Sequence, residues 1–163
     1  MEEFKKFFLQ PGYIFVSHEP HLIHTVLGSC VAVCIWDSVR KFGGVASFIY
    51  GSASSKNRSG KYGQVAIPHL IELLLELGSD EKDLKVHIVG GGEHPKYKSG
   101  IGHENAITAE KLLKKYPIEV LTRDIRGEFG RKVIFNSGNG EILIYKMHDI
   151  RKDDWYGCNG TEN

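Results

Sequence analysis

Short apolar runs separated by turn residues dominate the chain and predict more strand than helix. Runs rich in β-branched and aromatic side chains are typical of strands. They cover residues 13–17, 22–27, 31–36, 45–50, 84–89, 118–121, 132–135 and 141–147. Gly43-Gly44 separates one pair of runs, and Ser137-Gly138-Asn139-Gly140 separates another. These short turns predict two β-hairpins.

Two longer segments carry apolar residues at helical spacing. In the segment 64–77 they recur every three or four positions, and Gly78 ends the pattern. Pro68 must then lie in the first turn or bend the helix. The segment 104–115 has one apolar face and ends before Pro117. The pattern predicts a mixed α+β fold with a single domain over residues 1–150 and a polar tail over residues 151–163.

Composition and charge narrow the class of protein. The 163 residues include 21 basic and 20 acidic side chains and are 41% hydrophobic, which suffices for one buried core. A net charge of +1 argues against a nucleic-acid partner, because such proteins carry a basic surplus. The chain has no apolar run of membrane-spanning length, and its start resembles neither a signal peptide nor a lipidation site. We therefore expect a cytoplasmic protein without membrane insertion.

The three cysteines need separate interpretations. Cys30 follows Gly28-Ser29 at the entrance to a buried strand. In that position it is either a small core side chain or a nucleophile whose oxyanion the turn amides stabilise. Cys34 lies deeper in the same run and is expected to be structural. Cys158 lies in the polar tail and is expected to be inert.

Neither the histidines nor the glycine run predicts a cofactor. His18, His21 and His24 are spaced by three residues, but in a strand such positions point to opposite faces, so we expect no metal. Gly90-Gly91-Gly92 follows a strand but lacks the lysine of a P-loop and the spaced glycines of a dinucleotide site. A structural turn is the expectation there.

Several motifs in a fixed order between residues 12 and 147 are together more specific than any of them alone. They are Leu27-Gly28-Ser29-Cys30-Val31-Ala32-Val33-Cys34, Lys61-Tyr62, Val89-Gly90-Gly91-Gly92, Ile101-Gly102-His103-Glu104-Asn105-Ala106 and Gly130-Arg131-Lys132-Val133-Ile134-Phe135-Asn136. This set resembles the CheD family of chemoreceptor glutamine deamidases.

The resemblance implies a cysteine hydrolase with a mixed β-sandwich flanked by helices, similar to the catalytic cores of bacterial deamidating toxins. It implies that Cys30 is the nucleophile. It also implies that particular glutamines of methyl-accepting chemoreceptors are converted to glutamate with release of ammonia, and that methyl esters are removed in some members. The implied partners are chemoreceptor helices and a CheC-type phosphatase.

The sequence departs from the family pattern at the acid–base group. The family's histidine lies in an Ala-His pair, and the pair here is Ala46-Ser47. Serine cannot act as a general base of this kind, and such groups contribute about 10²- to 10⁴-fold to the rate. A threonine six residues before the cysteine, the family's third catalytic position, is His24 here, with Thr25 beside it.

Two hypotheses follow from this departure. In one, the His24 ring reaches Cys30 from the opposite wall and Ser47 orients it, since a volume-conserving exchange is tolerated in packed sites. In the other, catalysis is impaired and the chain is a binding module that regulates a CheC-type phosphatase or the receptor. A further departure is Asp124-Ile125-Arg126-Gly127, which replaces an Asp-Thr-Gly-Gly stretch. The loop 52–60 is either a flap for a partner or a solvated loop without a role.

Overall fold

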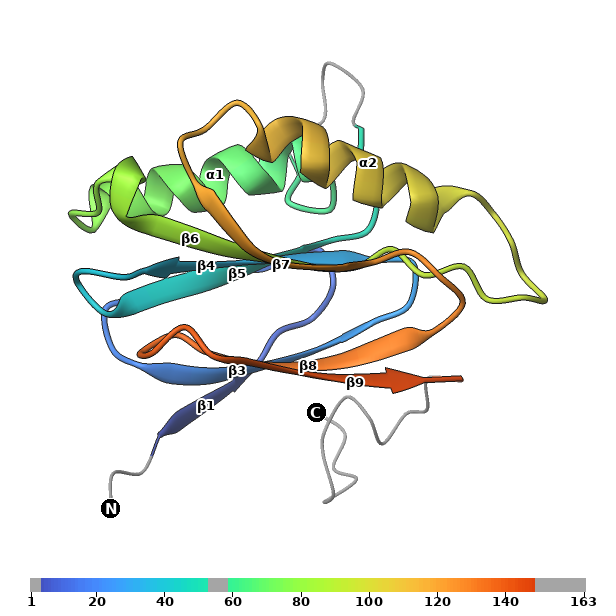
Figure 1. Cartoon of the computed structure of the whole chain (residues 1–163), viewed down its shortest axis with the longest axis horizontal. Helices are drawn as coiled ribbons and strands as arrows, with labels where there is room; N and C mark the ends of the chain where they lie inside the picture. The colour runs from blue at the N-terminus through green and yellow to red at the C-terminus, as the bar shows by residue number, and fades with distance from the viewer. Residues whose placement is uncertain (1–3, 53–58, 149–163) are drawn as a thin grey trace.

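The computed structural model describes residues 4–52 and 59–148, and these form three stacked layers (Figure 1). Two helices cover one face of a five-stranded sheet, and a four-stranded sheet packs against its other face, counting the described residues alone. The predicted mixed α+β sandwich flanked by helices is confirmed. No helix in the described part of the chain is long and apolar enough to cross a membrane.

The sheets are built from strands that are not consecutive in the sequence. The five-stranded sheet has the order β2 (Ile14–Ser17), β5 (Phe42–Phe48), β4 (Val31–Asp37), β6 (Leu84–Gly90) and β7 (Glu119–Ile125). The four-stranded sheet has the order β1 (Lys5–Phe8), β3 (His21–Leu27), β8 (Gly130–Asn136) and β9 (Ile142–Met147). The helices are α1 (Gly63–Glu76), α2 (Ile101–Leu113) and the short 3₁₀ helix η1 (Glu81–Asp83).

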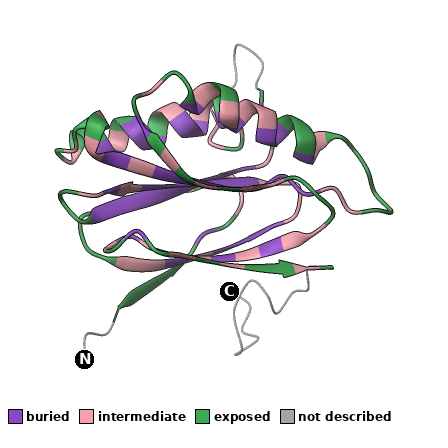
Figure 2. Ribbon diagram, viewed as in Figure 1, coloured by how far each residue is buried: buried purple, intermediate pink, exposed green. Residues whose placement is uncertain are grey.

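Strand β4 lies at the centre of the molecule and is buried on both sides, as Figure 2 shows by its purple colour. Val31, Val33 and Ile35 face the helices and join the core that α1 completes. Cys34 belongs to a second core, between the two sheets, together with Ala32 and the partly buried Trp36. A strand buried on both faces reads as a continuous apolar run, which explains the pattern that predicted it.

Both predicted hairpins are present, but the turn of the first is formed by residues 38–41, because Gly43 and Gly44 lie inside β5 and pair with β4. β4 pairs antiparallel with β5, and β8 pairs antiparallel with β9. Helix α1 ends before Gly78, whose φ of 108° suits glycine. Pro68 lies in the second turn of α1 rather than the first. The tail 151–163, with Cys158, and most of the loop 52–60 lie outside the described residues.

Two elements differ from the sequence expectation. Strand β1 was not predicted, because its four residues are all exposed and it is held by parallel pairing with β3 and by stacking of Phe7 on Phe15. Helix α2 begins at Ile101, three residues before the predicted start. Its first turn is fixed by Glu93, a residue outside the helix, whose carboxylate accepts hydrogen bonds from the backbone N–H groups of Ser99, Gly100 and His103 at 3.1–3.2 Å.

Candidate active site around Cys30

Cys30 lies in the short connection that leads from β3 in one sheet to β4 in the other. Its side chain is partly buried and packs against the core between the two sheets. Cys34, four residues further along the chain, is completely buried. Of these two cysteines solvent can therefore reach Cys30 alone, while Cys34 has the structural role expected of it.

Three successive carbonyl groups at this connection are held by hydrogen bonds from other segments. The carbonyl of Gly28 accepts from the N–H of Gly92 at 3.1 Å, and that of Cys30 accepts from the N–H of Gly91 at 2.9 Å. The carbonyl of Ser29 accepts from Nδ2 of Asn105 at 2.9 Å. In a trans peptide the C=O and the following N–H point in opposite directions. The N–H of Ser29 is therefore directed away from Gly92, and the N–H of Cys30 is directed away from Asn105.

The glycine run of residues 90–92 makes this arrangement possible because it lies in direct contact with the Cys30 backbone. A Cβ atom at Gly90 would lie 2.2 Å from the Cys30 carbonyl oxygen, and the φ of Gly90 is 115°. Both observations exclude a side chain at this position. The glycine run is a structural turn that holds the connection, which agrees with the sequence expectation.

Ser47 occupies the inner face of β5 beside Cys30. Its direct partner across the antiparallel pair is Ala32, two residues after Cys30, so Ser47 and Cys30 are diagonal neighbours. The Ser47 side chain is completely buried, and its hydroxyl has no hydrogen-bond partner among the described residues. The position that corresponds to the family's histidine therefore lies on the same face as Cys30, but it carries a group that cannot act as a base at neutral pH.

His24 does not share that face. Its pairing partners are Phe8 and Ile134, and its ring stacks on Phe8 with the ring centroids 4.7 Å apart. Its strand neighbour Ile23 faces the core between the sheets, so His24 projects from the outer side of the four-stranded sheet. Burial lowers the pKa of His24, and Lys132 and Lys6 lower it further. The structure does not bring His24 to Cys30, and the hypothesis of a ring reaching the thiol does not fit this placement.

Thr25, the residue after His24, faces the inner side of the four-stranded sheet. It is buried, and its hydroxyl donates a hydrogen bond to the carbonyl of Leu9 at 2.9 Å. Counting six residues back from the cysteine selected His24, whereas the alternation along β3 turns the next residue toward the inner face. Ile23 and Leu27 lie two positions from Thr25, but Leu22 and Val26 flank His24 at the same spacing, so alternation in the sequence did not separate the two residues.

The electrostatic environment of Cys30 disfavours the thiolate. Burial raises the pKa of Cys30 to about 11, and the opposing effect comes from the residue's own backbone N–H. Within the described part of the chain, neither a cation nor a histidine contributes to this pKa. At neutral pH the side chain is consequently a neutral thiol.

The remaining histidines of the spaced group do not gather around one point. The His21 ring lies edge-on to Phe15, at 4.9 Å between ring centroids, and the His18 ring lies edge-on to Phe42 at 5.3 Å. Among residues 4–52 and 59–148, no group of three or more His, Cys, Asp or Glu side chains could hold a metal ion.

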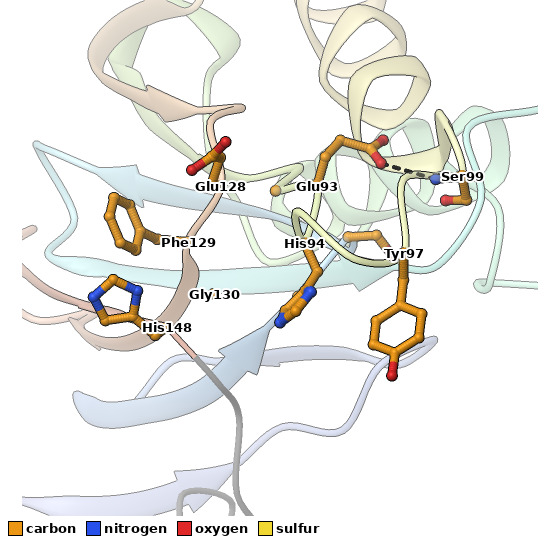
Figure 3. A pocket seen from close by; sticks show the side chains of 11 residues that line it. Glu93, His94, Tyr97, Ser99, Glu128, Phe129, Gly130 and His148 are labelled. Atoms are coloured by element: carbon orange, nitrogen blue, oxygen red, sulfur yellow. Dashed lines mark hydrogen bonds between the residues drawn. The ribbon is translucent and has the colours of Figure 1, made fainter.

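A cavity of about 370 Å³ lies behind the Cys30 connection, with Gly28 and Ser29 in its wall. Figure 3 shows its other side chains, which come from the loop after β6, from the start of β8 and from the end of β9. They include His94, Tyr97 and His148. The sequence interpretation did not identify them. Cys30 is not among the lining residues, so this cavity adjoins the backbone of the connection rather than the thiol.

Comparison with known proteins identifies one family. The family model described as CheD chemotactic sensory transduction matches residues 50–146. A protein named probable chemoreceptor glutamine deamidase CheD 1, from Anaeromyxobacter dehalogenans, is 38% identical over 143 residues, which are 86% of this chain and 84% of that protein. Probable chemoreceptor glutamine deamidases CheD from Trichlorobacter lovleyi and Methanococcus vannielii are 35% and 33% identical; each match covers 86% of this chain, and 89% and 94% of those proteins.

Proposed function

This chain belongs to the CheD family, and on that premise we propose that it is a chemoreceptor glutamine deamidase of chemotaxis adaptation with Cys30 as the nucleophile. The observation that carries the proposal is the Cys30 connection. Its three carbonyls are held by Gly92, Asn105 and Gly91, so the amide of Ser29 is directed away from Gly92 and the amide of Cys30 away from Asn105. A reachable cysteine beside two oriented amides supplies both a nucleophile and an oxyanion site.

The reaction balances with the Cys30 thiol, one water molecule and proton exchange with solvent. The ionised sulfur of Cys30 attacks the carbon of a receptor glutamine carboxamide, and the amides of Ser29 and Cys30 stabilise the oxyanion. The thiol proton passes to solvent before the attack. The C–N bond then breaks, the nitrogen takes a proton from solvent and leaves as ammonia, and a thioester remains. Water attacks the thioester, which yields glutamate and restores the thiol. The same sequence acting on a methyl ester would release methanol, so methylesterase activity is part of the proposal.

The proton transfers are the weak part of this site. With a pKa of about 11, about one Cys30 thiol in ten thousand is ionised at pH 7. Ser47 cannot raise that fraction, and His24 lies on the outer side of its sheet. We therefore propose a slow enzyme, whose rate in the isolated chain is limited by the supply of thiolate.

One observation favours a second function. Ser47 occupies the position where the resemblance places the acid–base group, and among the described residues neither a cation nor a histidine contributes to the pKa of Cys30. A fold that keeps the Cys30 connection without a base would recognise partners and leave them unchanged. The second candidate is therefore a binding module that regulates a CheC-type phosphatase or the receptor. Both candidates imply a cytoplasmic location.

Ammonia release from a receptor fragment tests the proposal. The full chain is incubated with a recombinant chemoreceptor signalling fragment, and ammonia and the mass of each glutamine-containing peptide are followed. Release that is lost in Cys30→Ala and kept in Cys34→Ala is the expected result. Deamidation that survives Cys30→Ala contradicts the nucleophile. Binding of the fragment or of a CheC-type phosphatase by both wild type and Cys30→Ala, without any ammonia, favours the binding module.

A further inference from the structure

Asn105 is a buried asparagine in α2 whose side chain reaches out of the helix to two other segments. Its Nδ2 donates one hydrogen bond to the carbonyl of Ser29 at 2.9 Å and one to the carbonyl of Ile49 at 2.8 Å. Its Oδ1 is buried without a partner among the described residues. Two carbonyl acceptors fix which end of the amide carries the hydrogens. The side chain is thus placed by its two donor bonds.

The two acceptors flank the point where β4 begins and β5 ends. Val31, the first residue of β4, pairs with Phe48, the last residue of β5. Ile49 directly follows Phe48 and lies opposite Cys30 by the register of the pair, and Ser29 directly precedes Cys30. The Asn105 amide therefore links the start of β4 to the end of β5, beyond the last residue pair that the two strands form.

The bond to Ser29 has a direct consequence for Cys30. It fixes the plane of the Ser29–Cys30 peptide, while the bond from Gly91 fixes the plane of the following peptide. With both neighbouring peptide planes held, the direction of the Cys30 Cα–Cβ bond is set. The N–H of Cys30 lies close enough to its own sulfur to lower the pKa of the thiol, against the larger effect of burial.

Close packing of α2 on the glycine run lets so short a side chain reach the connection. A Cβ atom on Gly102 would lie 2.3 Å from the carbonyl oxygen of Gly92. The missing side chain therefore brings the first turn of α2 into backbone contact with the turn after β6. Glu93 holds the same end of α2 through the N–H groups described above, so the helix is fixed where Asn105 projects.

We propose that Asn105 is a positioning residue for catalysis, which holds the Cys30 thiol and the Cys30 N–H in the orientation that the attack on a carboxamide requires. The inference rests on the proposed function, because it assigns Asn105 a part in the chemistry of the same thiol. It differs from a purely structural role, since loss of the two bonds changes the reactivity of Cys30 in a molecule that is still folded.

The decisive variant is Asn105→Asp, which keeps the size of the side chain and replaces its two donor hydrogens with an oxygen. Asn105→Ser, which keeps a single donor, is a graded second variant. Asn139→Asp is the matched control, because Asn139 is exposed in the β8–β9 hairpin and far from Cys30 in the sequence. Near-ultraviolet circular dichroism shows which variants fold.

Two readouts are measured on each folded variant: kcat and KM for deamidation of the receptor fragment, and the rate of Cys30 alkylation by iodoacetamide against pH. We expect Asn105→Asp to lower kcat about 10- to 100-fold with KM within about twofold, since misplacement of a reacting group by about 1 Å costs about 10² in rate. We expect alkylation of Cys30 at pH 8 to slow by about threefold or more, with Asn105→Ser intermediate and Asn139→Asp unchanged.

The outcomes separate the two proposals. An active wild type whose kcat and alkylation profile both survive Asn105→Asp overturns the role of Asn105 and leaves the deamidase proposal intact. A wild type that releases no ammonia, but whose alkylation profile changes in Asn105→Asp and not in Asn139→Asp, supports the positioning role and contradicts the deamidase. If neither Asn105 variant folds, the residue is structural and the positioning role is overturned.

Discussion

Ser47 and Cys30 are diagonal neighbours on the inner face of two adjacent strands, and the Ser47 hydroxyl has no hydrogen-bond partner among the residues that the structure describes. A side chain at position 47 is therefore aimed toward the thiol. What the site lacks is a group that exchanges protons at neutral pH. This single relationship governs the expected rate, its pH dependence and the effect of restoring a histidine.

Replacing Ser47 with histidine should increase deamidation. A histidine beside the thiol can accept its proton and return it to the leaving ammonia, and such groups contribute about 10²- to 10⁴-fold. Because position 47 is completely buried, the larger side chain should also lower the free energy of unfolding by about 1–3 kcal/mol. Ammonia release and urea denaturation measure the two effects. Ser47→Asn, which adds volume without a base, is the control, and an equal gain in rate from both variants would contradict the explanation.

Alkylation of Cys30 in the wild type should rise with pH without levelling off below pH 10. The thiolate is the reactive form, and with a pKa of about 11 its fraction increases about tenfold for each pH unit between 7 and 10. Peptide mass spectrometry assigns the modified cysteine. Cys34 should stay unmodified in the folded protein, because it is completely buried and burial raises its pKa far above the usual range. A plateau near pH 8 would reveal a cation beside the sulfur and contradict the neutral-thiol site.

The stability of the fold should fall when the pH drops below about 6.5, and His87 should be one cause. His87 is buried in β6, where its Nε2 donates to the carbonyl of Gly140 at 2.7 Å and its Nδ1 accepts from the hydroxyl of Thr122 at 2.9 Å. Burial lowers the pKa of His87 in the folded state. Below the unfolded-state pKa of about 6.5 the unfolded chain therefore binds a proton that the folded chain excludes.

The contribution of His87 is complete above about pH 6.5 and decreases as the pH falls toward the folded-state pKa, by at most about 1.4 kcal/mol per pH unit. Urea denaturation at pH 7.5 and 5.5 measures it, and His87→Gln should show a smaller difference between the two pH values than the wild type. His24, whose pKa burial also lowers, acts in the same direction, so His24→Gln is measured alongside. An unchanged pH dependence in His87→Gln would contradict the role of this histidine.

Arg126→Gly should stabilise the protein. Arg126 is an exposed residue in the turn between β7 and β8, with a φ of 69°. A side chain in this left-handed region costs about 1–2 kcal/mol, and the extra freedom of glycine in the unfolded chain offsets about 0.5–1 kcal/mol of that. We expect a net gain of about 0.5–1 kcal/mol in thermal or urea unfolding. Gly127→Ala, at a φ of 79°, is the opposite change and should destabilise the fold; a loss in both variants would show that the Arg126 side chain matters.

The elements with their own periodicity were predictable from sequence, and those held by distant partners were not. The run through β4 and the apolar stripe of α1 fixed the central strand and the larger helix, because each pattern reports burial of the residues that carry it. Strand β1 has no such pattern, since its four residues are exposed and depend on pairing with β3. The start of α2 depends on Glu93, which lies eight residues earlier. The residues next to the helix start carry no capping motif that would predict it.

The candidate site was predictable in part. The motif around Cys30 identified the connection, and the resemblance identified position 47, which does lie on the face of the thiol. His24 was assigned by counting residues from the cysteine, whereas the side of a strand on which a residue projects follows from its buried neighbours, Ile23 and Thr25. Asn105 was quoted only as part of a motif. An asparagine within a helix is unfavourable, because its side chain competes with the helical backbone for hydrogen bonds. Its occurrence inside the predicted helix was the sequence feature that could have indicated a specific role.

Contact between Gly90 and the Cys30 carbonyl has a consequence for how mutational surveys of this protein are interpreted. A methyl group at position 90 would overlap that oxygen, so alanine there must displace the backbone of Cys30. A saturation library screened for activity would score Gly90 as restrictively as Cys30, although glycine has no reactive atom. Intolerance to substitution around Gly90 and Cys30 therefore reports the space available to a side chain as well as a part in the reaction. Measuring the amount of folded protein together with turnover distinguishes the two causes.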